Sequence, residues 1–156
     1  MVKTSRLIVY RINSMPAVNI NYLAVIVAAI ANMVLGYLWY GPVFGKQWIA
    51  LMGMTSADME AAKAKGMGKS YVLTFVGALL MSYILAHSLI FAGAYFHASG
   101  VAAGLMSGFW SWVGFILPAL LGMMLWAGKP WKLYVLNVGY FLVALLVMGA
   151  ILGMWK

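Results

Sequence analysis

The sequence predicts an all-α, polytopic membrane protein with four transmembrane helices. Hydrophobic residues make up 66% of the 156 residues and charged residues only 8%, against about 45–50% and about 25% in soluble domains. No charge falls between Arg11 and Lys46, between Lys69 and Lys129, or between Lys132 and Lys156. Uncharged runs of this length indicate helices that cross lipid. A membrane β-barrel would instead show ten-residue segments of alternating polarity.

Breaks in the apolar runs set the expected ends of the helices. Pro42 is expected to end the first span, because proline lacks an amide donor and the residue before it avoids helical angles. A short uncharged link at 97–100 separates the second and third spans, and Gly128-Lys129-Pro130 separates the last two. The predicted spans are residues 20–40, 71–96, 102–127 and 133–154.

The polar segment 45–70 lies between the first two spans and is expected to hold a short surface helix. Thr55 offers a hydroxyl cap, and Asp58 and Glu60 suit the positive end of a helix. We interpret residues 15–156 as one four-helix domain and residues 1–14 as an N-terminal extension. Met15 is an alternative start of translation.

Two pairs of segments are similar to each other. Leu38-Trp39-Tyr40-Gly41-Pro42 resembles the segment 125–130, and Lys69-Ser70-Tyr71-Val72-Leu73 resembles the segment 132–136. One interpretation is a helical hairpin used twice, with both copies in the same orientation. Chance similarity between apolar segments is the other.

The distribution of basic residues predicts the orientation. The loops after the first and third spans carry six lysines (Lys46, Lys63, Lys65, Lys69, Lys129 and Lys132), and the opposite side carries Lys3, Arg6, Arg11 and Lys156. Because basic residues are enriched in cytoplasmic loops, loops 1 and 3 are expected in the cytoplasm of a prokaryotic cell. A basic tail held inside the cell would reverse this orientation.

Reactive groups are scarce, so we expect no enzymatic activity. The chain has no cysteine, and its two acids, Asp58 and Glu60, both lie in the polar loop on different faces of a helix. We predict no cofactor and no metal site. We also predict no nucleic-acid partner, because the basic residues form no patch interleaved with aromatics.

Three polar residues inside the spans form the candidate intramembrane polar site: Asn32, His87 and Asn137. Polar groups in lipid are costly and often functional. Each asparagine is expected to bond across a helix interface. His87 is either hydrogen-bonded to a neighbouring helix or acts as a ligand or proton relay. Pro118 is expected to kink the third span.

Small residues recur at helical spacing and form the candidate packing or oligomer face: Ala24, Ala28, Gly36, Gly104, Gly108, Gly149 and Gly153. Such residues let helix backbones approach closely, which matters in lipid because burial of apolar surface does not hold helices together there. These faces pack either within one bundle or between subunits.

The end of the first span forms a candidate loop-side turn of Trp39, Tyr40, Gly41, Pro42, Lys46 and Trp48. Its aromatic rings are typical of the membrane interface.

Several parts of the sequence resemble domain-of-unknown-function family 1761. They are segments 19–25 and 36–48, Gly66-Met67-Gly68-Lys69-Ser70-Tyr71, Asn137-Val138-Gly139-Tyr140 and segment 148–153. This resemblance covers residues 15–156 and implies a small prokaryotic four-span protein with no assigned activity.

These observations predict a non-enzymatic membrane protein that acts as a self-associating structural or accessory subunit. Its expected partners are membrane lipids and either further copies of itself or a larger membrane complex. The alternative is a small-solute transporter or channel, with a path near the intramembrane polar site and Pro118.

Overall fold

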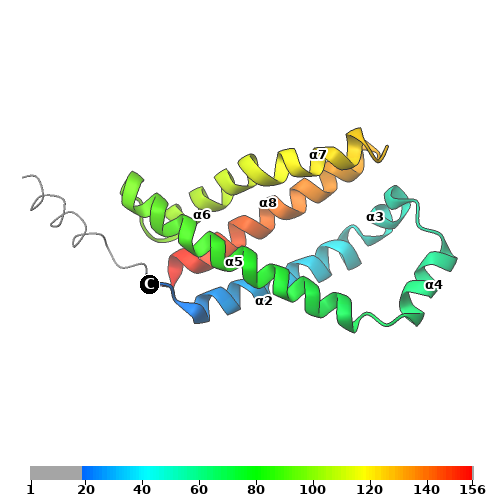
Figure 1. Cartoon of the computed structure of the whole chain (residues 1–156), viewed down its shortest axis with the longest axis horizontal. Helices are drawn as coiled ribbons and strands as arrows, with labels where there is room; N and C mark the ends of the chain where they lie inside the picture. Colours follow the sequence, from blue (N-terminus) through cyan, green and yellow to red (C-terminus); the bar gives the residue numbers. More distant parts are fainter. Residues whose placement is uncertain (1–18, 156) are drawn as a thin grey trace, which may run out of the picture.

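The computed structural model describes residues 19–155, and they form an all-α bundle (Figure 1). Four helices are long and apolar enough to cross a membrane: Tyr22–Val43, Gly68–Phe96, Gly100–Leu125 and Trp131–Met154. The predicted fold class is therefore confirmed. Residues 1–14, interpreted above as an N-terminal extension, lie outside the described residues. The basic residues used for the orientation on that side, Lys3, Arg6, Arg11 and Lys156, also lie outside them.

The first span continues past the proline that was expected to end it. Helix α2 (Tyr22–Leu38) leads into η1 (Trp39–Val43), one turn of π-helix with Pro42 inside it. The turn closes when the Phe44 amide donates to the Trp39 carbonyl oxygen, five residues back, at 2.9 Å. The prediction that Pro42 ends the span was wrong, because the wider turn carries the proline.

The loop between the first two spans contains two short helices, α3 (Gly45–Met52) and α4 (Ser56–Ala64). At the start of α4 the Asp58 amide donates to Thr55 Oγ1 (3.2 Å), and the Thr55 amide donates to Asp58 Oδ2 (2.9 Å). This reciprocal capping box satisfies amides that the helix leaves free. No residue of α4 is buried, and the helix extends beyond the end of the bundle (Figure 1).

The second and third spans are joined by a tight turn. Helix α5 (Gly68–Phe96) is capped by His97, whose φ of 53° is in the left-handed region. The third span consists of α6 (Gly100–Ser111), the π-helical turn η2 (Trp112–Ile116) and α7 (Leu117–Leu125). Pro118 lies in the first turn of α7, directly after the π-helical turn. The departure from regular α-helix thus begins six residues before the proline.

The closest packing in the bundle joins α6 to α8 (Trp131–Met154). A Cβ atom on Gly104 would overlap the carbonyl group of Gly149, and one on Gly153 would overlap the carbonyl group of Gly100. A Cβ on Gly108 would lie 2.5 Å from the Leu145 carbonyl oxygen. The two backbones are therefore in direct contact, which only glycine permits.

Small residues of α2 are also packed inside the chain. Ala24 and Ala28 are 1% and 0% exposed, and a Cβ on Gly36 would lie 3.1 Å from the hydroxyl oxygen of Tyr140 on α8. All seven residues of the candidate packing or oligomer face thus pack between helices of one chain. This arrangement matches the first of the two interpretations, packing within one bundle.

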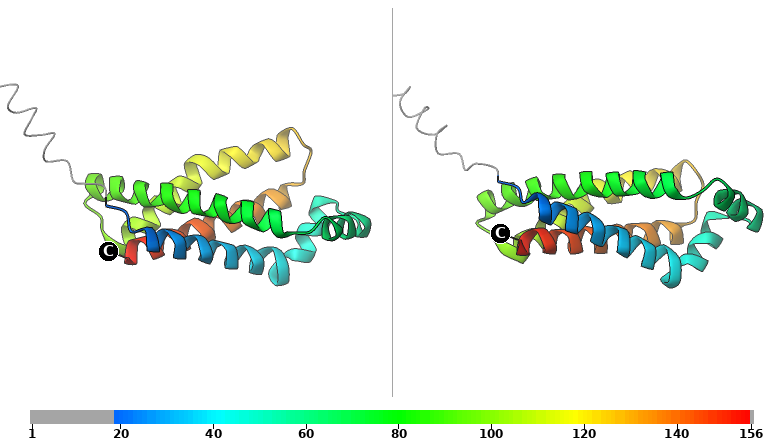
Figure 2. Two further views of the ribbon diagram at one scale, coloured as in Figure 1. Left: turned by 60° about the horizontal axis from the view of Figure 1, so that its bottom comes forward. Right: turned by 90° about the horizontal axis from the view of Figure 1, so that it is seen from below.

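The bundle is open at the end that carries α4. Helix α7 packs on α8 and η2 and, among the described residues, makes no extensive contact with α2 or α5. Both views in Figure 2 show α5, α2 and α8 close together near the C-terminus, and the left view shows α7 diverging from α5 toward the other end. Every residue from Gly68 to Thr74, the first two turns of α5, is exposed.

The glycine contact between α6 and α8 predicts a large cost of adding one methyl group. Gly104→Ala is expected to lower the free energy of unfolding by about 1–3 kcal/mol, because the α6 and α8 backbones must separate. Gly77→Ala is the matched control, since a Cβ there meets nothing within 4 Å. Reversible unfolding in mixed micelles would measure the free energy of unfolding of both variants. Equal stability of the two variants would contradict the contact.

The capping box predicts a low pKa for Asp58. The Thr55 hydroxyl, and then the Thr55 amide, donate hydrogen bonds to the carboxylate and hold its pKa below the ordinary value. The stabilisation of α4 by this carboxylate is therefore present above the unfolded-state pKa and is lost as the pH falls through the lowered one. Thr55→Ala is expected to raise the Asp58 pKa, and Thr55→Ser to leave it low.

Asp58 is the only aspartate in the chain, so carbon-13 labelling of aspartate Cγ gives one signal to titrate by NMR. An Asp58 pKa that is the same in Thr55→Ala as in the natural chain would show that the hydroxyl does not hold the carboxylate.

Candidate functional site

The candidate site lies at the loop-side end, where η1 and α3 meet the first turns of α8. The π-helical turn directs the side chains of Trp39 and Tyr40 toward α8. Tyr40 Oη donates to Asn137 Oδ1 at 3.1 Å, and its ring lies 5.0 Å from the Tyr140 ring, between centroids. The Trp48 ring packs edge-on against Tyr40 with centroids 5.6 Å apart.

A second tyrosine–asparagine pair lies beside the first. Tyr140 Oη donates to Asn32 Oδ1 at 2.9 Å, and both residues are buried. We refer to Asn32, Tyr40, Asn137 and Tyr140 as the Asn–Tyr cluster. Each amide oxygen accepts from a tyrosine on another helical segment, so the cluster joins the first span to α8 by polar contacts inside lipid.

His87 does not belong to this cluster. Its Nδ1 lies 2.9 Å from the carbonyl oxygen of Tyr83 one turn earlier in α5, the geometry of a ring N–H donating to that oxygen. Its ring packs edge-on against the Tyr83 ring, with centroids 4.5 Å apart. The predicted grouping of Asn32, His87 and Asn137 is therefore corrected: the two asparagines lie in one cluster, and the half-buried histidine is bonded to its own helix.

The loop-side turn is brought together only in part. Trp39 and Tyr40 face α8, and Trp48 packs against Tyr40, whereas Gly41, Pro42 and Lys46 are exposed. The Trp39 ring contacts Phe44 at 4.7 Å between centroids, and a Cβ on Gly139 would meet this ring at 3.6 Å. The Trp39 indole Nε1 is buried without a hydrogen-bond partner among the described residues.

An apolar groove of about 850 Å³ runs between α3 and α8 next to this turn. Its walls come from three elements: Trp39 and Phe44 of η1 and its cap, Gln47, Ala50 and Leu51 of α3, and Trp131, Lys132, Val135, Leu136 and Gly139 of α8. Lys129 Nζ donates to the carbonyl oxygen of Met52 at 3.0 Å. This bond ties the last residue of α3 to the link before α8.

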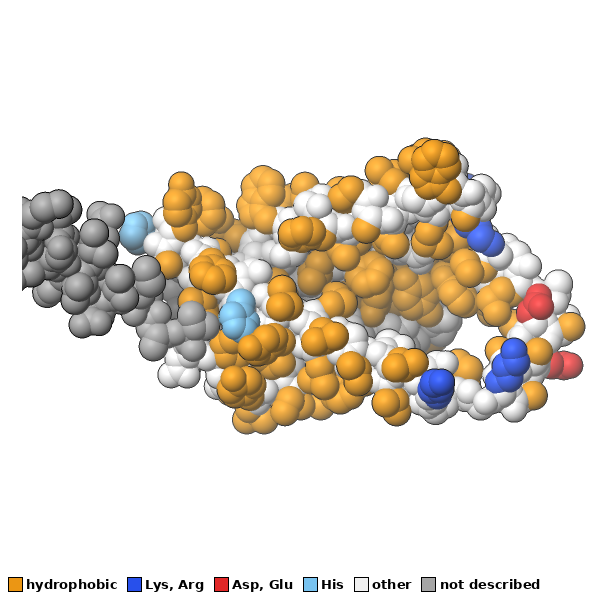
Figure 3. All heavy atoms as spheres, in the orientation of Figure 1, with side chains coloured by type: hydrophobic (Ala, Val, Ile, Leu, Met, Phe, Trp, Pro, Cys, Tyr) orange, Lys and Arg blue, Asp and Glu red, His pale blue; other side chains and the backbone are white. Residues whose placement is uncertain are grey.

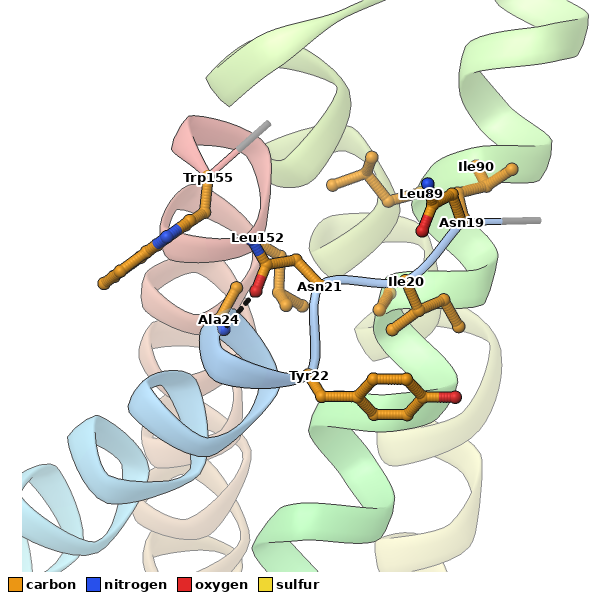
Figure 4. A pocket seen from close by; sticks show the side chains of 10 residues that line it. Asn19, Ile20, Asn21, Tyr22, Ala24, Leu89, Ile90, Leu152 and Trp155 are labelled. Atoms are coloured by element: carbon orange, nitrogen blue, oxygen red, sulfur yellow. Dashed lines mark hydrogen bonds between the residues drawn. The ribbon is translucent and has the colours of Figure 1, made fainter. Parts of the chain in front are cut away.

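Two further cavities lie elsewhere in the bundle. One, of about 600 Å³, is at the opposite end of the bundle, at the start of α2, and its lining includes Asn19, Tyr22 and Trp155. Figure 4 shows this cavity and the Asn21 side chain that caps the Ala24 amide beside it. The other, of about 290 Å³, lies between α5 and α6 and includes Ser107, whose buried Oγ has no partner among the described residues. Neither Asn32 nor Asn137 lines any of these three cavities.

Charged and apolar side chains are segregated along the molecule. Figure 3 shows hydrophobic side chains over the body of the bundle, and acidic and basic side chains together at the α4 end. Within residues 19–155, no three histidine or acidic side chains are close enough to hold a metal ion. The α4 end thus carries charged groups of both signs beside the interfacial aromatic residues.

Sequence reasoning missed Tyr140 and Lys129. A tyrosine in the middle of an apolar span carries a hydroxyl that needs a partner, and Tyr140 lies three residues after Asn137, on a neighbouring part of the same helix face. That spacing was the available signal for Tyr140. The bond from Lys129 to Met52 joins residues far apart in the sequence, and no local pattern indicates it.

The Asn–Tyr cluster predicts a measurable cost of removing one hydroxyl. Tyr140→Phe is expected to lower the free energy of unfolding by about 1–2 kcal/mol, because Asn32 Oδ1 is left buried without its donor. Adding Asn32→Leu is expected to recover part of the loss. Tyr37→Phe is the control, since Tyr37 is 71% exposed. Unfolding curves in micelles that coincide for Tyr140→Phe and Tyr37→Phe would refute the role of this bond.

Comparison with known proteins identifies the family. The family described as "Protein of unknown function (DUF1761)" matches residues 23–153, which include the Asn–Tyr cluster and the four spans apart from their outermost residues, Tyr22 and Met154. No curated protein and no solved structure matches the chain. Since the match covers most of the chain, this four-span membrane protein belongs to the DUF1761 family.

Proposed function

We propose that this protein is a non-enzymatic subunit of the membrane that associates with further copies of itself. The observation that carries the proposal is the open end of the bundle. Residues Gly68–Thr74 of α5 are exposed on every side, and among residues 19–155 α7 packs extensively only on α8 and η2. A polytopic bundle gains van der Waals contacts when such unpartnered helices pair.

The surface proposed for self-association differs from the one expected from the sequence. The small-residue faces are used inside the chain, so the proposed contact is the exposed side of α5 near its start, including Val72, Leu73, Val76 and Leu80. A second copy is the proposed occupant because copies inserted in the same orientation bring their α4 ends together. A two-fold axis along the membrane normal places the two α4 helices, with their exposed acids and lysines, on the same side of the membrane.

The charges at this end support a symmetric contact. Asp58 and Glu60 are exposed on α4, and Lys69 is exposed at the start of α5. In a symmetric dimer each such pair of opposite charges occurs twice. The scarcity of nucleophiles and acids inside the spans supports the non-enzymatic part of the proposal.

The transporter or channel alternative has less support. A path would need several polar groups along one water-filled route. Asn32 and Asn137 are instead closed off by tyrosines, and His87 is bonded to its own helix. We also propose, from the six lysines of loops 1 and 3, that these loops face the cytoplasm of a prokaryotic cell.

Crosslinking tests self-association directly, because the chain has no cysteine of its own. Single-cysteine variants Leu73→Cys, Val76→Cys and Leu80→Cys, made in native membranes and treated with a short thiol crosslinker, are expected to yield dimers. Ile30→Cys on α2, where the residue is 49% exposed, is the matched control and is expected to remain monomeric.

The outcomes separate the alternatives. Monomers at all α5 positions, or dimers formed equally well by Ile30→Cys, would contradict the proposed contact. A specific crosslink from α5 to a different membrane protein would contradict self-association and support the accessory role in a larger complex.

A further inference from the structure

The groove between α3 and α8 has the features of a lipid site, and this inference does not depend on self-association. Its floor is formed by flat and small side chains: the ring of Trp39 packs over Gly139, which has no side chain. Val135 and Leu136 of α8 continue the apolar floor, and Ala50 and Leu51 of α3 form the facing wall. The volume of about 850 Å³ is within the range of ligand pockets, about 300–1,000 Å³.

The walls of the groove are held in place independently of any ligand. The bond from Lys129 Nζ to the Met52 carbonyl oxygen fixes the end of α3 to the start of α8. At the other end of α3, the Trp39–Phe44 contact and the π-helical turn fix its beginning. The space between α3 and α8 is therefore preformed, which lowers the entropic cost of filling it.

The charge at the rim is positive. Lys132 lines the groove and is exposed, and the Lys129 ammonium group lies where α3 and the link before α8 meet. The acids Asp58 and Glu60 are on α4, which extends away from the bundle (Figure 1). Basic residues beside an apolar pocket at the membrane interface are the pattern that binds anionic lipid headgroups.

We propose that this groove binds an anionic phospholipid. One acyl chain lies along the floor formed by Trp39, Gly139 and Val135, and the phosphate lies against Lys132, where Gln47 adds a neutral hydrogen-bonding group. The exposed ring of Trp131, next to Lys132, flanks the boundary between acyl chain and headgroup, the depth that tryptophan favours.

Native mass spectrometry of the full chain tests the proposal with two probes of equal acyl chains, dioleoyl phosphatidylglycerol and dioleoyl phosphatidylcholine. One phosphatidylglycerol per chain is expected to remain bound under conditions that remove phosphatidylcholine. Lys132→Gln is expected to weaken phosphatidylglycerol binding about fivefold, the factor that corresponds to about 1 kcal/mol for one lysine at a membrane surface. Lys65→Gln on the α4 cap is the matched control.

A second variant tests the acyl chain separately from the charge. Ala50→Trp fills the groove from its exposed wall without entering the core, and is expected to reduce retention of both lipids. Ala64→Trp, at the exposed end of α4, is its control, and melting curves identify any variant that has lost its fold.

Equal retention of the two lipids by the natural chain would overturn the proposal, as would Lys132→Gln binding phosphatidylglycerol like the Lys65→Gln control. Inorganic phosphate that raises the melting temperature as strongly as phosphatidylglycerol would also overturn it, because the site would then bind a free anion and not a lipid.

Discussion

The direct contact between the backbones of α6 and α8 is the constraint on which the rest of the bundle depends. In lipid, apolar side chains gain little by meeting one another, so helices are held by close packing and by polar bonds. Gly104 and Gly149 provide the first, at the end of the bundle near the C-terminus. The Asn–Tyr cluster provides the second, nearer the loops, where the first span crosses α8. With both ends of α8 fixed in this way, α8 is the most buried of the four spans.

This arrangement leaves two exposed surfaces on the loop side of the molecule, and they differ in character. The start of α5 is exposed on all sides, which suits contact with another helix. The groove between α3 and α8 is apolar and is bordered by Lys132, which suits an acyl chain with an anionic headgroup. The two surfaces lie on separate elements, so one subunit can use both at once.

The fold could be predicted from the sequence because charges are excluded from lipid, and the uncharged runs therefore marked the four spans. The depth of His87 along α5 could be predicted in the same way, but its face could not, since that helix is apolar all round and gives no rotational signal. Asn32 and Asn137 were expected to need partners, yet the tyrosines that serve them are set by how α2 and α8 are rotated. Small residues indicated close packing without indicating which neighbour, so packing within one chain and packing between subunits looked alike.

The π-helical turn at Trp39–Val43 holds one residue more than an α-helical turn. Such a residue shifts the angular phase of everything after it by about 100°, one step of the helical wheel. A strict 3.6-residue repeat continued through Trp39 would therefore assign wrong faces to the last residues of the span, up to Val43. Deleting a single residue from this turn would change the direction in which the chain leaves the span toward α3, so the length of the turn is fixed by geometry even though its outer residues, Gly41 and Pro42, are exposed.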